Sequence, residues 1–293
     1  MRPDRAVIPA MGVAMALAMV TVPAASQVPF RFEFRPDPRL TVRTIVASRG
    51  DVLLVGLPGL SDSVVAEWES LAGLTRRIQA GATDPYAISL TFDSVRTRFR
   101  WRHGTWRDVS LVPAEPLRLE FVTDARLSVF GPTAVEDSAR AILVSGAATL
   151  AHLALPEQPL TPGGEWSADF VFPFALQIPG EEPGRIAGLM TGPGIGTLDS
   201  LVLRGGDTLA YLSVRGRFIP TSAQTTVELG GSPALAEVWG GFAGQFIWST
   251  AWSAFVSVAL TTRVNQRLEA PLGSGIEDAR ITATLTTRVW VRS

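Results

Sequence analysis

The chain contains no cysteine and no lysine, only two histidines, and a single asparagine, Asn265. Without cysteine there is no disulfide, and no lipid can be attached to an N-terminal cysteine. A zinc site built in the usual way from His and Cys ligands would have only two histidines available. The sequence therefore predicts no metal site, and the folded chain must be held together by its core alone.

Patterns for nucleophilic and nucleotide chemistry are also lacking. A Ser-His-Asp triad would have to use His103, at a predicted turn, or His152, near the end of a predicted buried helix. There is no Gly-x-Ser-x-Gly elbow, and the glycine-rich stretch 188–196 lacks the Gly-Lys-Ser/Thr of a phosphate loop. Asp93-Ser94 and Asp199-Ser200 resemble repeated edge or turn positions. We predict no catalytic residue and no cofactor, although a hydrolase that uses two carboxylates remains open.

Charge of one sign is not in excess, because the formal net charge is −1. All 26 cationic side chains are arginines, which we interpret as GC-rich coding bias and not as a sign of function. No overall field favours nucleic acid or an acidic membrane surface. The 46% hydrophobic content over 293 residues is enough for a substantial core.

The N-terminus has the pattern of a secretory signal. A basic start at 1–5 precedes an apolar run over 6–22, and the small residues Ala24 and Ser26 suit cleavage before Gln27. We predict residues 1–26 to be a signal peptide and the protein to be exported to the periplasm or outside the cell. A retained membrane anchor is the alternative.

One helix and one long strand are predicted near the middle of the chain. Thr133-Ala-Val-Glu136 is a capping box, and the apolar residues that follow predict a helix over 133–153 that ends before Pro156. Prolines and a Gly-Gly pair make 155–164 an extended connection. Beyond it, apolar residues at every second position predict a strand over 166–178.

The remaining pattern is that of β-structure in two halves. Phe30–Phe34 alternates as a strand, and Arg49-Gly-Asp51, also a cell-adhesion tripeptide, is interpreted as a hairpin turn. The stretch 61–78 suits a strand or a helix, and we favour the strand. Several short matches recur in the same order, such as the turns at Gly50-Asp51 and Gly206-Asp207.

These matches predict an all-β fold of two related antiparallel modules of curved sheets, at 27–132 and 165–293. The helix and the Pro/Gly connection at 133–164 join them.

Val238–Thr262 contains only apolar and uncharged polar side chains. This uncharged stretch of some twenty residues is long enough for a transmembrane helix. Residues such as Gly240, Ser249 and Thr250 dilute its apolar content, and its apolar residues recur at strand spacing. We therefore predict a β-hairpin that turns at Ser249-Thr250, and no transmembrane span in the mature chain.

Two sets of residues are candidates for ligand binding. The first is Arg96, Arg98, Arg100 and Arg102, which share one face of a predicted strand and could receive phosphates, acidic sugars or lipid head groups. The alternative is a solvated outer face balanced by neighbouring acids. The second is the one-sided aromatic row Trp166, Phe170, Phe172 and Phe174, which could line an apolar pocket or simply be core.

A resemblance to known exported proteins implies a cellular location for the chain. The run Leu155–Trp166 before a long strand, together with Gly-Thr-Leu-Asp-Ser200 and Gly-Asp-Thr-Leu-Ala210, resembles exported β-rich proteins of environmental Gram-negative bacteria, a domain of unknown function. It implies a fold and an envelope location and transfers no catalytic residue. In architecture alone, a helix beside curved sheets is similar to LolA-like periplasmic lipoprotein carriers.

The sequence therefore favours a non-enzymatic envelope protein that binds a lipid or another apolar or amphiphilic molecule. A structural or protein-interaction module with a filled core is the alternative, and a carboxylate-based hydrolase is third.

Overall fold

The computed structural model describes residues 28–56, 64–78, 85–101, 104–109, 118–123, 129–130, 155–178, 184–218, 225–229, 232–269 and 279–292. These residues form thirteen strands and no helix. The strands are β1 Val42–Val55, β2 Val64–Ile78, β3 Tyr86–Trp101, β4 Arg107–Val109, β5 Arg118–Thr123, β6 Val129–Phe130, β7 Glu165–Ile178, β8 Gly184–Arg204, β9 Asp207–Phe218, β10 Thr225–Leu229, β11 Ser232–Ser249, β12 Ala254–Glu269 and β13 Ala279–Arg292. The prediction of an all-β antiparallel fold is confirmed.

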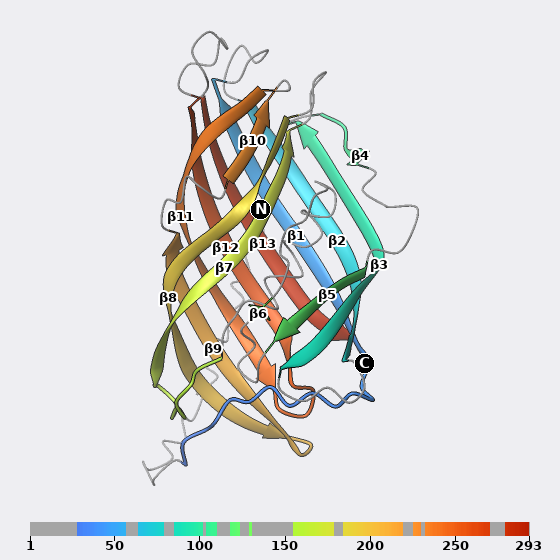
Figure 1. Ribbon diagram of the computed structural model, residues 1–293, viewed down its shortest axis with the longest axis vertical. Coiled ribbons are helices and arrows are strands. Elements are labelled where there is room, and N and C mark those ends of the chain that lie inside the picture. Colours follow the sequence, from blue (N-terminus) through green and yellow to red (C-terminus); the bar gives the residue numbers. More distant parts are fainter. Residues whose placement is uncertain are drawn as a thin grey trace, which may run out of the picture.

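All thirteen strands belong to one sheet, which curves along its width (Figure 1). The order runs β8-β9-β11-β12-β13-β1-β2-β3-β5-β6, and β7 pairs with β8. β10 lies between β8 and β11 beyond the end of β9, and β4 lies on β3 beyond the end of β5. Every pairing is between antiparallel strands, and the first and last long strands, β1 and β13, lie side by side.

The pairing of β1 with β13 places both predicted modules, 27–132 and 165–293, in one continuous sheet. Whether they are related modules stays a prediction. The helix predicted at 133–153 and the signal peptide at 1–26 lie outside the described residues. No helix within the described ranges is both long and apolar enough to cross a membrane.

One face of the sheet carries the core, and we call it the inner face. Along β1 the side chains alternate between buried and exposed or half-buried, as period-two geometry requires. Buried Ile88 on β3 and Leu212 on β9 belong to the same apolar cluster. Six strand steps would hold these residues about 30 Å apart in a flat sheet. Because the sheet is curved, side chains from strands far apart in the strand order pack into one core on its inner face.

The predicted hairpins in the second half are confirmed. Gly205 and Gly206 have φ angles of 59° and 84° and connect β8 to β9, as a tight two-residue turn of the mirror-image type requires. The stretch 238–262 forms most of β11 and β12, and the chain turns between Ser249 and Ala254. The ambiguous stretch 61–78 contains strand β2, as favoured.

The predicted turn at Arg49-Gly-Asp51 is wrong, because Gly50 lies in the middle of β1, opposite Leu285 of β13. A Cβ atom at Gly50 would overlap the Leu285 side chain and come within 2.5 Å of the Thr284 carbonyl oxygen. Glycine is present so that two strands can approach closely. The correspondence between Gly50-Asp51 and the true turn at Gly206-Asp207 therefore does not extend to their structures.

The two Asp-Ser pairs are not edges or turns but β-bulges inside long strands. On β3, Phe92 pairs with Leu74 and Ser94 with Gly73, so Asp93 is the extra residue. On β8, Leu198 pairs with Leu212 and Ser200 with Tyr211, which makes Asp199 the extra residue there. An inserted residue switches the side chains beyond it to the opposite face.

The Asp93 bulge decides which way the predicted arginine row faces. Before it, even-numbered Ile88 and Phe92 are buried. Beyond it, odd-numbered Trp101 packs on the core, and even-numbered Arg96 lies outside with 66% of its side chain exposed. Without the bulge, the arginines would point into the apolar interior.

Candidate functional site

The inner face carries the hydrophobic core of the described molecule. Its lining comes from β1, β2, β3, β8, β9, β11, β12 and β13, and most of its side chains are almost fully buried. Aromatic rings meet edge to face on it, with Trp248 and Phe255 centroids 5.1 Å apart and Phe246 and Phe255 centroids 5.6 Å apart. Such a face has the chemical character of a site for an apolar molecule.

Two segments outside the sheet add side chains to this core. Residues 28–41, here called the N-terminal strap, contribute Phe32 and Phe34, and the proline-rich connection contributes Leu155 and Leu160. Phe30 and Leu160 exchange two backbone hydrogen bonds of 2.7 and 2.9 Å. Phe30–Phe34 was predicted to be a strand. Its alternate burial is as expected, but among the described residues it joins no strand of the sheet and bridges only to Leu160.

The edges of the sheet do not meet in the described part of the chain. β6 pairs only with β5, and β7 pairs only with β8, so no ladder joins these two ends. The inner face is thus enclosed by curvature and not by a closed ring of described strands (Figure 1).

One end of the inner face carries a half-buried cation, Arg76 of β2. Its Nη1 donates to the Ser253 carbonyl oxygen and its Nη2 to the Trp252 carbonyl oxygen, each over 3.1 Å. Its guanidinium lies 5.6 Å from the Phe34 ring centroid. Burial lowers the pKa of Arg76 to about 10, so the side chain remains protonated at neutral pH.

The N-terminal strap is hydrogen-bonded to the β11–β12 turn at the same end of the inner face as Arg76. The Ser253 hydroxyl donates to the Arg35 carbonyl oxygen over 2.8 Å and accepts from the Arg35 N–H over 3.2 Å. Ser253 has a φ of 41°, an uncommon value for a residue other than glycine. Asp207 holds the same turn by accepting from Ser249 Oγ over 2.5 Å and from the Ala251 N–H over 2.9 Å.

We expect Asp207→Asn to lower the free energy of unfolding by about 1 kcal/mol at pH 7, since solvent screens part of the interaction. Partial burial alone would raise the pKa of Asp207, but hydrogen bonds from Ser249, Ala251 and Thr250 bring it below its ordinary value of 3.8. A lowered pKa stabilises the fold above the unfolded-state pKa, and this contribution is lost as the pH falls through the folded-state value.

Urea unfolding of wild type and D207N at pH 7 and pH 3 measures the free energy of unfolding. The difference between the two proteins should be smaller at pH 3 than at pH 7. Asp51→Asn on the outer face is the matched control. A gap that is the same at both pH values would contradict the assigned role.

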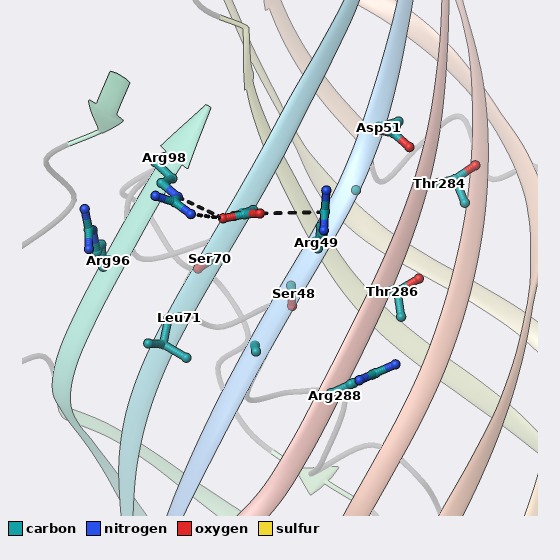
Figure 2. A pocket seen from close by; sticks show the side chains of 13 residues that line it. Ser48, Arg49, Asp51, Ser70, Leu71, Arg96, Arg98, Thr284, Thr286 and Arg288 are labelled. Carbon is teal, nitrogen blue, oxygen red and sulfur yellow. Dashed lines mark hydrogen bonds and ion pairs between the residues drawn. The ribbon is translucent and has the colours of Figure 1, made fainter. Parts of the chain in front are cut away.

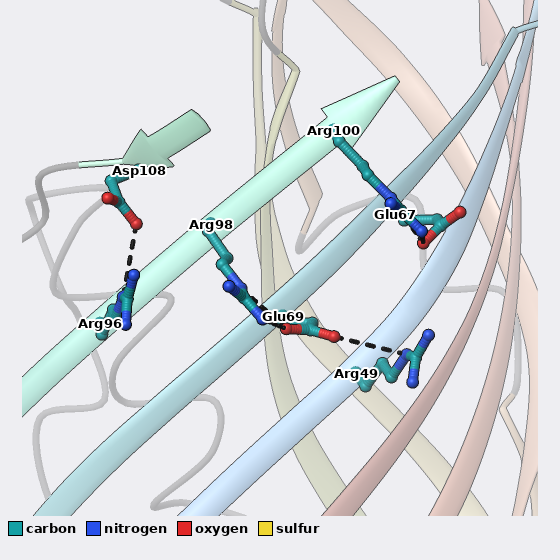
Figure 3. Close-up of polar contacts among 7 residues, drawn as sticks. All are labelled: Arg49, Glu67, Glu69, Arg96, Arg98, Arg100 and Asp108. Atoms are coloured by element: carbon teal, nitrogen blue, oxygen red, sulfur yellow. Dashed lines mark hydrogen bonds and ion pairs between the residues drawn. The ribbon is translucent and has the colours of Figure 1, made fainter. Parts of the chain in front are cut away.

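The described arginines of the predicted row, Arg96, Arg98 and Arg100, lie on the outer face, and Arg98 and Arg100 pair with acids of β2 (Figure 3). Arg98 donates to Glu69 Oε2 from Nε and Nη2 over 2.8 and 2.5 Å. Arg100 donates to Glu67 in the same way over 2.9 and 2.7 Å. The predicted alternative, an outer face balanced by acids, describes this arrangement, and ligand binding by the arginines stays a prediction.

Trp106 and Asp108 complete this cluster. The Trp106 ring centroid lies 4.6 Å from the guanidinium carbon of Arg98 and 4.7 Å from that of Arg100, within cation–π range. Arg96 makes a longer contact of 3.4 Å with Asp108, and both side chains are exposed. Arg102, the fourth predicted arginine, lies outside the described residues.

An open hollow of about 660 Å³ crosses β3, β2, β1 and β13 on the outer face (Figure 2). Its described lining includes Arg49, Arg96, Arg98 and Arg288, with Thr284 and Thr286 on the β13 side. Arg49 lies 3.6 Å from Glu69, which also binds Arg98. The sheet itself separates this hollow from the inner face.

The predicted aromatic row lies on β7. Trp166 is half-buried and packs against the core, and its ring occupies the space that a side chain at Gly196 would need. Phe170, Phe172 and Phe174 belong to the β7 backbone ladder with β8, but their side chains lie outside what the structure describes. Their role in binding is therefore still a prediction.

Comparisons with known proteins do not assign the chain. No family model matches it, and no curated protein does. A solved structure that concerns lipid–protein interactions in lipovitellin matches with a TM-score of 0.47 and 12% identity, over 89% of this chain and 26% of that chain. An OmpF structure from Salmonella typhi in complex with daunomycin matches with a TM-score of 0.22 and 8% identity, over 85% and 97% of the two chains.

At these TM-scores neither likeness bears on function. The resemblance to exported Gram-negative proteins and the analogy to LolA stay predictions.

Sequence reasoning missed Arg76, although a signal was present. Ala66, Ala72 and Leu74 are buried on the inner face of β2, and continuing their alternation places Arg76 and Ile78 on the same face. The described residues contain no group of three or more His, Asp or Glu side chains that could hold a metal ion.

Proposed function

We propose that this chain is an exported, non-enzymatic envelope protein that binds an apolar or amphiphilic molecule, such as a lipid, against the inner face of its sheet. The observation that carries the proposal is the continuous apolar lining contributed by eight strands. Binding would remove the apolar surface of a ligand from water at about 25 cal/mol per Å².

Residues 27–132 and 165–293 are, in this proposal, two related modules joined by a helix at 133–153, and the ligand lies between parts contributed by both. The aromatic residues Trp166, Phe170, Phe172 and Phe174 would add to the lining from β7. No cofactor takes part.

A structural or protein-interaction module with a filled core is the second candidate. It is favoured by the near-complete burial of inner-face side chains such as Trp248 and Phe34, both 0% exposed. Such packing leaves less room for a guest unless part of the core moves aside.

Native mass spectrometry of the protein purified from its own host separates the two candidates. We expect a co-purifying lipid-sized molecule that is lost on delipidation. Titration of the delipidated protein with 1-octanol, 1-decanol and 1-dodecanol should raise its melting temperature. Affinity should increase about fourfold per added methylene if the site encloses the chain. No bound molecule, together with an unchanged melting temperature for all three alcohols, would favour the filled core.

A further inference from the structure

Arg76 is a charged residue in an apolar position. Its cross-strand partners are Val42 on β1 and Leu90 on β3, the first buried and the second packed against the core. The adjacent Arg77 lies on the opposite face and is exposed. Strand geometry therefore assigns one arginine of this pair to water and the other to the apolar interior.

Contacts within the described residues use only part of the hydrogen-bonding capacity of Arg76. A guanidinium has five N–H donors and no acceptor, and the described contacts account for two of them, to the carbonyl oxygens of Trp252 and Ser253. No carboxylate forms an ion pair with Arg76 in the described part of the chain. Asp207 belongs to the same turn network, but it accepts from Ser249, Thr250 and Ala251.

A second donor lacks an acceptor at this end. The indole Nε1 of Trp248, the residue just before this turn, is buried and has no hydrogen-bond partner. Within the described residues, a half-buried cation lacks a counter-charge and a buried N–H lacks an acceptor, and each is costly away from water. An oxyanion entering from the inner face would supply the counter-charge that Arg76 lacks.

We infer that Arg76 binds the anionic head group of an amphiphile whose apolar chain lies along the inner face. The head group is an oxyanion, a carboxylate or a phosphate, and both suit the planar guanidinium fork. This inference rests on the proposed function and specifies its ligand class: an anionic lipid-like molecule and not a neutral one.

The first test compares ligands that share one chain and differ in charge. Delipidated full-length mature protein is titrated with dodecanoate, dodecyl phosphate, 1-dodecanol and dodecylammonium at pH 8, with binding measured by calorimetry. The ionic ligands are kept below their critical micelle concentrations and the alcohol below its solubility limit. We expect the anions to bind about ten- to a hundredfold more tightly than the alcohol, as loss of a charge-assisted hydrogen bond implies. Dodecylammonium should bind most weakly. The ratio of dodecanoate to dodecyl phosphate distinguishes a carboxylate from a phosphate source.

The second test replaces the residue. Arg76→Gln should weaken dodecanoate binding about ten- to a hundredfold and change 1-dodecanol binding less than about threefold. Arg76→Lys keeps the charge and should retain part of the preference for anions. Arg77→Gln, one residue away on the outer face, is the matched control and should alter neither ligand. Circular dichroism and melting temperature report whether each variant is folded.

The outcomes separate the inference from the function on which it rests. Equal affinity of the wild type for dodecanoate and 1-dodecanol overturns the anion subsite and leaves apolar binding intact. Equal weakening of both ligands by R76Q also overturns it, because Arg76 would then act only as a structural clamp between β2 and the turn. If the wild type binds none of the four, both proposals fail. The comparison of dodecanoate with 1-dodecanol on the wild type tests the anion subsite even if R76Q does not fold.

Discussion

Replacing Trp248 by alanine is expected to lower the free energy of unfolding by about 3–5 kcal/mol. The side chain is 0% exposed and its ring lies edge to face against Phe255, with centroids 5.1 Å apart. Removing it deletes a large apolar surface and leaves a cavity at the end of the inner face. The effect would be measured by guanidinium unfolding followed by circular dichroism.

Trp290→Ala is the matched control for this prediction. Trp290 lies on β13 with 39% of its surface exposed, so the same change of side chain should cost only about 1 kcal/mol. Equal losses for the two variants would contradict the assignment of inner and outer faces. Trp248→Phe should cost less than W248A, because it keeps an aromatic ring and removes the buried N–H that has no partner.

Gly50→Val is expected to destabilise the fold by about 3 kcal/mol, at the upper end of what overpacking usually costs. The added atoms would overlap Leu285 and the Thr284 carbonyl oxygen of β13. Relief requires β1 and β13 to move apart, although this pairing joins the first and second halves of the chain. The melting temperature and the urea midpoint are the measurements.

Ala47→Val lies three residues earlier on β1, on the outer face and beside the open hollow. It adds a β-branched side chain at a position that lines the open hollow, and we expect a change in the free energy of unfolding within about 0.5 kcal/mol. A G50V variant as stable as A47V would mean that Gly50 does not lie in close contact with Thr284 and Leu285 of β13. That result would restore the interpretation of Arg49-Gly-Asp51 as a turn.

Local patterns were enough where neighbouring residues decide the structure. The Gly205-Gly206 turn was predictable because few other residues adopt two consecutive positive φ angles. The β11–β12 hairpin was predictable from strand spacing on both sides of Ser249-Thr250. The same kind of evidence misled at Gly50, because a glycine required for close strand approach and a glycine required for a turn have the same local pattern.

Register and charge pairing depended on residues far apart in the chain. The Asp93 bulge turns the arginine row outward, where Glu67 and Glu69 of β2 neutralise Arg100 and Arg98. A bulge is defined by two strands together, so one strand's alternation does not reveal it. Predicting the arginines on one strand face was sound, but their acidic partners lie about thirty residues away in sequence.

The sequence by itself determined that the chain is β-rich and antiparallel, without disulfides, and with strands and turns set by period-two alternation and by glycine. These properties depend on backbone sterics and on side chains within a few residues of one another. Only the tertiary structure decided that β1 pairs with β13 in a single curved sheet and that Arg76 lies inside it beside Phe34 and the carbonyl oxygens of residues 252 and 253. The physical reason is that sheet curvature and the partial burial of one charge arise from contacts between residues more than a hundred positions apart, which no local pattern records.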